Sequence, residues 1–381
     1  MSGIADSKIM IRIFGTLPTL TRTRTQGVAL PGLDQDGFLI AFSLFFLLSS
    51  LCLAQAPSRA KNPCTACHAQ GRTQPSTSMG HASETIQEAA SLQGAEPLTF
   101  SNNGYSYRID HREGQAIYAV TDGKENFEIP IGWAVGAGRI GQTYVYQKDG
   151  EFYEGRVSYF SEVKGLDITI GHSSQRPANL QEAAGRRMEA SEITRCFGCH
   201  MTNAVDDHGL ALTKALPGVQ CVRCHTSAAK HLAGLAEGEL HLDEMTKLKT
   251  MSTEEISNFC GQCHRTLEEV LMRKQQDITT LRFQPYRLAL SKCYDPEDSR
   301  ISCLACHDPH EELTTETAHY DAKCLACHNG GKPKAQPCKV SKKDCTNCHM
   351  PKVEVPGSHH KFADHTIHIV KVSSPKAGKS R

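Results

Sequence analysis

The motif Cys-x-x-Cys-His occurs seven times in this chain of 381 residues and uses fourteen of its seventeen cysteines. Numbered 1 to 7 in chain order, the motifs begin at Cys64, Cys196, Cys221, Cys260, Cys303, Cys324 and Cys345. Two thiols three positions apart can form thioethers with one haem, and the histidine that follows can ligate its iron. The spacing therefore predicts seven covalently attached haem c groups.

The predicted attachment residues are the two cysteines of each motif: Cys64, Cys67, Cys196, Cys199, Cys221, Cys224, Cys260, Cys263, Cys303, Cys306, Cys324, Cys327, Cys345 and Cys348. The predicted proximal iron ligands are His68, His200, His225, His264, His307, His328 and His349. A zinc site pairs two CxxC units or adds a distant histidine, and a redox CxxC needs no trailing histidine. Neither alternative explains seven identical copies.

The N-terminal region predicts export. Phe38 to Ala54 is apolar and uncharged, which suits the hydrophobic part of a signal peptide better than a spanning helix. Cleavage is expected before Gln55, so residues 1–54 are interpreted as a signal peptide with an N-terminal extension. Retention of the segment as a membrane anchor is the alternative. The sequence thus predicts a periplasmic or otherwise extracytoplasmic protein, exported by a signal peptide and in the alternative membrane-anchored.

The composition excludes some partners. The formal net charge of +1 argues against a nucleic-acid partner. Aromatic residues make up only 6% of the chain, so haems are expected to fill the interior in place of a protein-only core. Two propionates on each expected haem would make the loaded protein acidic. We therefore expect redox partner proteins with a basic patch, such as other cytochromes or quinol-linked complexes.

The cysteine distribution predicts the domain organisation. A first haem segment covers residues 55–97, and residues 98–172 form a cysteine-free antiparallel β module of five or six strands. Asp149-Gly150 and Asp122-Gly123 mark expected turns in this module. Its expected role is structural, covering haem edges or providing a docking face, and ligand binding is the alternative.

Residues 173–351 carry the other six motifs, about one every 26 residues, which leaves room for short helices and loops only. The expected fold class is α+β with little regular structure: a multihaem array with the β module inserted between haems 1 and 2. Ser252 and Glu255 form a capping box that predicts a helix running to about Lys274. A second helical pattern covers Asn179 to Ile193, and residues 352–381 form a C-terminal extension with a disordered end.

Twelve histidines lie outside the motifs, enough to supply a second axial ligand to every haem. His231 and His310 follow motif histidines too closely to reach the same haem, so each is expected to reach a neighbouring one. The other candidates are His81, His172, His208 and His319, and His360 and His365 compete for the last place. Met79 is the alternative to His81 and would raise the potential of its haem.

Two cysteines outside the motifs, Cys293 and Cys338, follow the expected cleavage site. In an oxidising compartment such a pair is expected to form a disulfide, with two separate thiols as the alternative.

The segments CVRCHTSAAKH, CLACHDPH and CTNCHMPKVEVPG resemble bacterial multihaem cytochromes of the cytochrome c-552/4 type with doubled CxxCH modules. The resemblance covers about Asn62 to His81 and Ser191 to His368. It implies closely stacked, mostly bis-histidine haems that pass electrons in a periplasm. The wider group includes pentahaem nitrite reductase and hydroxylamine oxidoreductase. This chain lacks the CxxCK motif of the former and the eighth haem of the latter, so neither activity transfers.

The expected function is electron transfer, which requires no catalytic residue. The alternative is a multihaem reductase of a nitrogen or sulfur oxyanion, in which one haem has an open distal site. A third hypothesis is a subunit that the β module docks into a larger redox complex.

Overall fold

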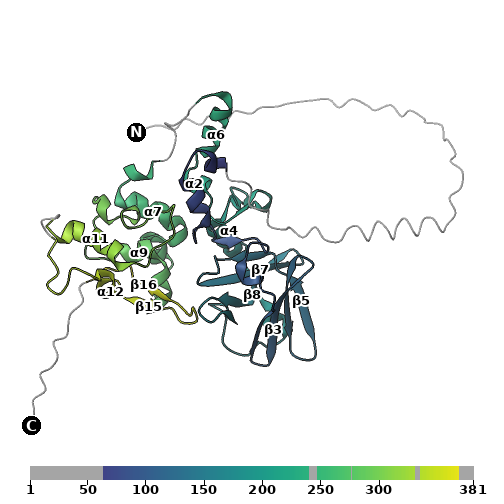
Figure 1. Ribbon diagram of the computed structural model, residues 1–381. Coiled ribbons are helices and arrows are strands. Elements are labelled where there is room, and N and C mark those ends of the chain that lie inside the picture. Colours follow the sequence, from purple (N-terminus) through teal and green to yellow (C-terminus); the bar gives the residue numbers. More distant parts are fainter. Residues whose placement is uncertain (1–62, 240–246, 276, 331–334, 369–381) are drawn as a thin grey trace, which may run out of the picture. The chain divides into compact units, whose positions relative to one another are not determined.

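The computed structural model describes residues 63–239, 247–275, 277–330 and 335–368, which all belong to one compact unit, Leu53–Arg381 (Figure 1). The predicted signal peptide with its cleavage site, His241, and the predicted disordered end from residue 369 lie outside the described residues. None of the described helices has the length and apolar character that a membrane span requires.

The first sheet of the β module is a four-stranded antiparallel meander in the order β2-β3-β4-β5. Its strands are β2 (Leu98–Asn102), β3 (Tyr105–Arg112), β4 (Gln115–Thr121) and β5 (Asn126–Pro130). The turn between β4 and β5 forms at the predicted Asp122-Gly123. There the Asp122 carboxylate accepts hydrogen bonds from the N–H groups of Lys124 and Glu125, both at 2.8 Å.

The second sheet is also antiparallel, in the order β1-β6-β7-β8-β10, with β9 paired to β8. Its strands are β1 (Ser83–Glu84), β6 (Trp133–Val135), β7 (Gly141–Lys148), β8 (Glu151–Phe160), β9 (Gly165–Ile168) and β10 (Gly185–Arg187). Asp149 and Gly150 join β7 to β8 with φ angles of 53° and 81°, the positive values that a two-residue hairpin turn requires. The predicted hairpin is confirmed, and the module has more strands than expected.

Alternating residues of both sheets build the core of the module. Tyr107, Tyr118, Tyr144, Tyr146 and Val157 are each at most 2% exposed and belong to one apolar cluster. The period-2 pattern of the sequence therefore buries one face of each sheet. Tyrosine supplies most of the large side chains in this core.

A second apolar cluster joins the module to helix α4 (Ala190–His200), which carries motif 2. Phe197, the residue after the first cysteine of that motif, is fully buried. Its ring centre lies 5.2 Å from that of Trp133 and 5.9 Å from that of Phe152. The β module thus packs directly against the backbone turn of motif 2.

The remaining helices are short: α2 (Gln70–Thr73), α3 (Leu180–Ala184), α5 (Cys221–Cys224), α6 (Ala228–Glu237), α7 (Thr253–His264), α8 (Leu267–Met272), α9 (Gln284–Ala289), α10 (Cys303–Cys306), α11 (Thr317–His328) and α12 (Cys345–His349). They alternate with 3-10 turns, including η6 (Ile278–Arg282), and with the small strand pairs β11-β14 (Met201–Thr202, Leu216–Pro217), β12-β13 (Val205–Asp206, Gly209–Leu210) and β15-β16 (Lys352–Glu354, Lys361–Ala363).

The capping box of Ser252 and Glu255 is confirmed, but its helix ends earlier than predicted. Helix α7 stops at His264 because Arg265 has a φ of 66°, and Thr266 then caps the next helix. The helical pattern predicted over Asn179–Ile193 is likewise interrupted. Strand β10 separates α3 from α4, because its backbone pairs with β8.

Two polar contacts connect the β module to the segments around the later motifs. The Glu312 carboxylate forms an ion pair with Arg139 of the module and accepts hydrogen bonds from the N–H and hydroxyl of Ser78 at 2.6 and 2.8 Å. Near the C-terminus, His359 Nε2 lies 2.7 Å from a carboxylate oxygen of Asp167 in β9.

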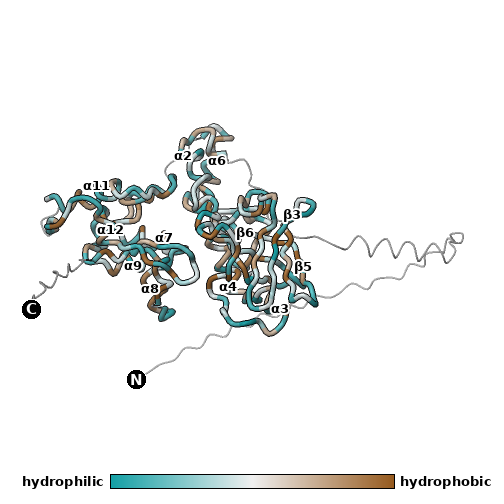
Figure 2. The backbone as a smooth tube through the Cα atoms, turned by 60° about the horizontal axis from the view of Figure 1, so that its bottom comes forward, coloured by the Kyte–Doolittle hydropathy of each residue, from teal (hydrophilic) through white to brown (hydrophobic). Residues whose placement is uncertain are grey.

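Both apolar clusters of the described residues lie within residues 86–215. Figure 2 shows the same concentration: brown, apolar stretches follow the strands around β5 and β6, whereas residues around α11 are largely teal. Helix α8 is an apolar exception, and its Leu271 and Met272 are 49% and 69% exposed. The described residues of the segment that carries motifs 3 to 7 therefore form no apolar core by themselves.

The Phe197→Ala variant tests the contact between the module and motif 2. Emptying a fully buried aromatic site costs about 3–5 kcal/mol, so thermal unfolding should occur at a clearly lower temperature. The control is Val163→Ala on the module surface, where the side chain is 49% exposed and the expected change is within about 0.5 kcal/mol. Equal melting temperatures for the two variants would contradict the packing described.

Candidate haem sites

All seven motifs adopt a single helical turn. In motifs 1, 3 and 5 the N–H of the histidine donates to the carbonyl of the first cysteine at 2.9 Å. In the other four motifs the histidine is the last residue of α4, α7, α11 or α12. Residues at i, i+3 and i+4 share one face of a helix, so both thiols and the imidazole of each motif lie on the same side.

The motif side chains line one cavity of about 2930 Å³. Its wall includes all seven motif histidines and every cysteine of the described residues. A pocket for one small ligand has roughly 300–1,000 Å³, so this cavity has space for several large planar groups. The cavity extends from motifs 1 and 2 and the edge of the β module through the segment of motifs 3 to 7.

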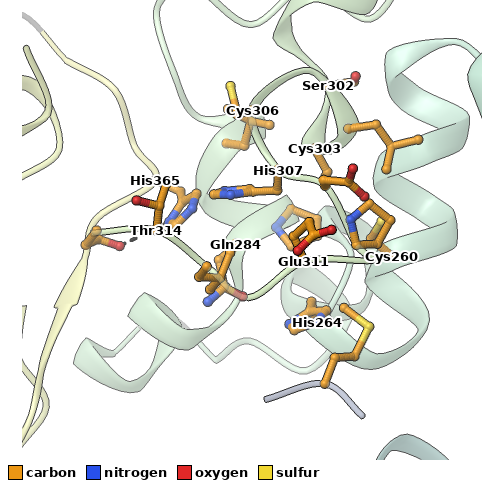
Figure 3. A pocket seen from close by; sticks show the side chains of 18 of the residues that line it. Cys260, His264, Gln284, Ser302, Cys303, Cys306, His307, Glu311, Thr314 and His365 are labelled. Atoms are coloured by element: carbon orange, nitrogen blue, oxygen red, sulfur yellow. Dashed lines mark hydrogen bonds between the residues drawn. The ribbon is translucent and has the colours of Figure 1, made fainter. Parts of the chain in front are cut away.

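Three motif histidines face a histidine from outside the motifs. The ring centres are 6.3 Å apart for His68–His231, 6.2 Å for His225–His310 and 6.2 Å for His307–His365. Figure 3 shows the last pair, with the two rings pointing toward one another across the cavity. A metal–nitrogen bond of about 2.0 Å on each side, plus about 1 Å from nitrogen to ring centre, gives about 6 Å between centres. Each pair therefore has room for one iron.

The facing histidines come from distant parts of the chain. His231 lies on α6 after motif 3 but faces motif 1, and His310 lies after motif 5 but faces motif 3. His365 comes from the C-terminal segment and faces motif 5. Neither His231 nor His310 lies opposite its own motif.

Hydrogen bonds orient three other motif histidines. The Nδ1 atoms of His200, His328 and His349 lie 2.7–2.8 Å from the carbonyl oxygens of Ala82, Gln336 and His368. An Nδ1–H that donates to a carbonyl fixes the tautomer whose Nε2 carries a lone pair. These rings therefore present Nε2 as the atom that can ligate iron.

Burial favours the neutral form of four motif histidines, those of motifs 2 to 5. Loss of hydration lowers the pKa of His307 to about 4, and the nearby rings of His365 and His319 add to the effect. Burial also lowers the pKa of the histidines in motifs 2, 3 and 4. Since a histidine must be neutral to bind a metal, these side chains have the required protonation state at neutral pH.

Four further predicted ligands lie in or beside the cavity. His319 and His360 line it, with rings packed edge-on against Tyr320 and Phe362. Met79 also lines it. His81 is half-buried, and its Nδ1 lies 2.6 Å from the Glu84 carboxylate.

Two predicted ligands are placed elsewhere. His172 is nearly buried in the β module, and its Nε2 lies 3.1 Å from the Glu154 carboxylate. His208 is exposed in the turn between β12 and β13. Neither lines the cavity, and the structure brings neither to a motif histidine.

The structure adds one histidine that sequence reasoning passed over. His368 lines the cavity, and its Nδ1 lies 2.8 Å from the Thr366 carbonyl. The available signal was the density of histidines in residues 359–368, where four of ten positions are histidine.

The motifs are connected in an order that differs from the sequence. Helix α7 of motif 4 contacts both α4 of motif 2 and α10 of motif 5, and Cys199 Sγ lies 3.7 Å from the Gln262 carbonyl. Contacts continue from α10 to α11 and from α11 to α12. Motif 1 meets the region of motif 3 through His68–His231, and Arg223 of motif 3 lies 3.4 Å from the Gly198 carbonyl of motif 2. Motif 4 therefore lies between motif 2 and motif 5 in this series of contacts.

The expected Cys293–Cys338 disulfide does not form, and both residues are thiols. Cys293 is half-buried, within electrostatic range of Cys306 and Cys324, whereas Cys338 is exposed on the segment between α11 and α12. Within the described ranges there is also no group of three or more His, Cys, Asp or Glu side chains arranged to hold a metal ion.

A family model described as "Cytochrome c554 and c-prime" matches residues 167–226, which include motifs 2 and 3. No curated protein and no solved structure matches the chain. The family match supports a cytochrome c family with covalently bound haem and haem-based electron transfer. It agrees at this level with the resemblance seen in the motifs.

Alkylation of the folded, haem-loaded protein tests the state of the two remaining cysteines. Cys338 is exposed, and the N–H groups of Ser341 and Val340 lower its pKa, so it should react first with iodoacetamide. Cys293 should react more slowly because it is half-buried. Mass spectrometry should show the fast modification disappear in Cys338→Ser. A protein that takes up no label before reduction would instead contain the disulfide.

Proposed function

We propose that this protein is a seven-haem c-type cytochrome that transfers electrons between redox partners. The observation that carries the proposal is the set of three imidazole pairs, 6.2–6.3 Å between ring centres, inside the cavity that every motif lines. An ordinary packed protein has no reason to hold pairs of imidazole rings apart at this spacing.

Each haem would be held by the two cysteines and the histidine of one motif. His231, His310 and His365 are the proposed second ligands of motifs 1, 3 and 5. The remaining candidates, His81, His319, His360 and His368, are available to the other motifs. Bound haem would supply one-electron redox chemistry, while the chain fixes ligand identity, orientation and exclusion from water.

The contacts between motifs support a continuous path for electrons. Motif 4 contacts motifs 2 and 5, motif 5 leads to motifs 6 and 7, and motif 3 connects motifs 1 and 2. Every motif therefore has a neighbour within the same cavity. Motifs 1 and 7 are the proposed ends of the path, where partner proteins would exchange electrons.

We further propose an extracytoplasmic location, because haem is attached covalently outside the cytoplasm and residues 1–54 have the pattern of an export signal. The proposed partners are other cytochromes or quinol-linked complexes. A docking role for the β module belongs to the same proposal, since its polar contacts with Glu312 and His359 connect it to the motif segments.

The alternative function, reduction of a nitrogen or sulfur oxyanion, requires one haem with an open distal side. One observation favours it: in the described part of the chain, His200, His264, His328 and His349 face no second imidazole at the iron spacing. A haem at one of these motifs would then have a replaceable sixth ligand.

Haem stoichiometry tests the proposal. Pyridine haemochrome analysis together with intact mass should give seven haems per chain, each bound through two thioethers. Six haems would point to an empty motif 1, which stands apart from the others in the sequence. Four or fewer would contradict the proposal.

The His310→Ala variant tests a proposed second ligand and the alternative function together. Removing the imidazole opposite His225 should convert about one of seven low-spin ferric EPR signals to high spin. The matched control is His208→Ala, which removes an exposed histidine outside the cavity and should change nothing. A high-spin signal already present in the unmodified protein, and shifted by nitrite or sulfite, would favour the reductase.

A further inference from the structure

The cavity wall is strongly basic although the chain as a whole is nearly neutral. Fifteen lysines and arginines line the cavity, against seven aspartates and glutamates, whereas the whole chain has 42 basic and 41 acidic residues. Charges inside a protein are stable when they are paired. Several of these cations, including Lys339, Lys342 and Lys343, are exposed, and together they give the wall a positive potential that favours anions.

Arg282 is the clearest case of an unpaired cation in this wall. Most arginines of the described residues that have a shifted pKa show a raised value, because a carboxylate lies beside them, as in Arg112, Arg186 and Arg300. The pKa of Arg282 is lowered, and burial is the cause. Arg282 is exposed by its accessible surface and lines the cavity, and no described carboxylate forms an ion pair with it.

The backbone holds Arg282 firmly in place. It is the last residue of η6, where Thr280 and Leu281 are at most 1% exposed and the Thr280 hydroxyl donates to the Asp277 carbonyl at 2.8 Å. The following helix is fixed by a two-point ion pair of Arg287 with Asp364, at 2.9 and 2.6 Å. The backbone position from which the Arg282 side chain extends is therefore well defined.

The position of Arg282 is at the meeting of two motifs. Arg282 ends η6, which contacts α9, and α9 packs against α7 of motif 4. Arg282 and His264 of motif 4 also lie within electrostatic range of His200 in motif 2. Gln284, two residues further on, is the first residue of α9. Figure 3 shows Gln284 and His264 on the wall of the same cavity.

We propose that Arg282 binds the propionate carboxylate of a haem at the junction of motifs 2 and 4 and raises the reduction potential of that haem. A planar guanidinium pairs with a carboxylate through two parallel hydrogen bonds. A fixed positive charge also disfavours the ferric state, which is more positive than the ferrous state by one charge. This inference rests on the proposed function, because it requires haem at these motifs.

A free oxyanion, such as nitrite or sulfite, carries negatively charged oxygens as a propionate does. It is the other anion that could pair with the Arg282 guanidinium. The propionate is favoured because it is tethered to the haem that the motif cysteines hold, and it is present whether or not a substrate is. An oxyanion at Arg282 would belong to the reductase alternative.

Spectroelectrochemical titration of the haem-loaded Arg282→Gln variant tests the proposal. One midpoint should move to a more negative potential, with about a tenfold change in its reduced-to-oxidised ratio, which is 59 mV for a one-electron couple. Arg282→Lys keeps the charge and should show a smaller shift, and it serves as the second variant if Arg282→Gln does not assemble. Arg112→Gln, on the exposed face of β3, is the matched control and should leave every midpoint unchanged.

The outcomes separate the possibilities. Haem content is measured first. A protein with fewer than seven haems would contradict the proposed function, and its titration would not test the role of Arg282. Full haem content in Arg282→Gln with a titration curve identical to that of the unmodified protein would overturn the propionate assignment. Unchanged midpoints combined with loss of a nitrite- or sulfite-induced EPR change would also overturn it, and would identify Arg282 as an oxyanion site.

Discussion

The feature on which the rest of the structure depends is an internal cavity in place of an apolar core. In the described residues beyond 215 only scattered side chains such as Ile256, Leu281 and Val355 are buried, and they form no cluster. Polar contacts organise the chain there instead, for example the Asp321 carboxylate, which accepts hydrogen bonds from the N–H groups of Asp344 and Cys345 at 2.8 Å. Burial of apolar surface is the main favourable term in folding. Haem faces would have to supply that surface in this segment.

The two parts of the chain therefore depend on different sources of stability. The β module buries tyrosines and aliphatic side chains between two sheets, and it extends this packing to α4 through Phe197. The segment of motifs 3 to 7 keeps its own shape through caps, turns and ion pairs. Contacts at Glu312 and His359 connect the two parts. The well-packed β module therefore supports the segment of motifs 3 to 7, which has little apolar packing of its own.

The sequence predicted the local features and missed those that depend on distant residues. Each motif forms its helical turn, and the Ser252 cap and the Asp149-Gly150 turn are local patterns that the structure confirms. The end of α7 at Arg265 was missed because the next cap competes with helix extension. The facing of His68 by His231 depends on tertiary folding, which residue spacing does not determine. For the same reason the sequence could not predict that Arg282 has no described ion-pair partner, because this depends on where the carboxylates lie in the folded chain.

The apolar cluster between the two sheets of the β module contains no cysteine and no motif histidine. Its packing can therefore be completed before any cofactor is attached, in contrast to the cavity. Domains tend to fold as units, with N-terminal ones first during synthesis. Because α4 then packs on the finished module through Phe197 and Trp133, motif 2 receives a preformed scaffold. With the module between motifs 1 and 2, a rigid template would be present before any haem is attached to the later motifs.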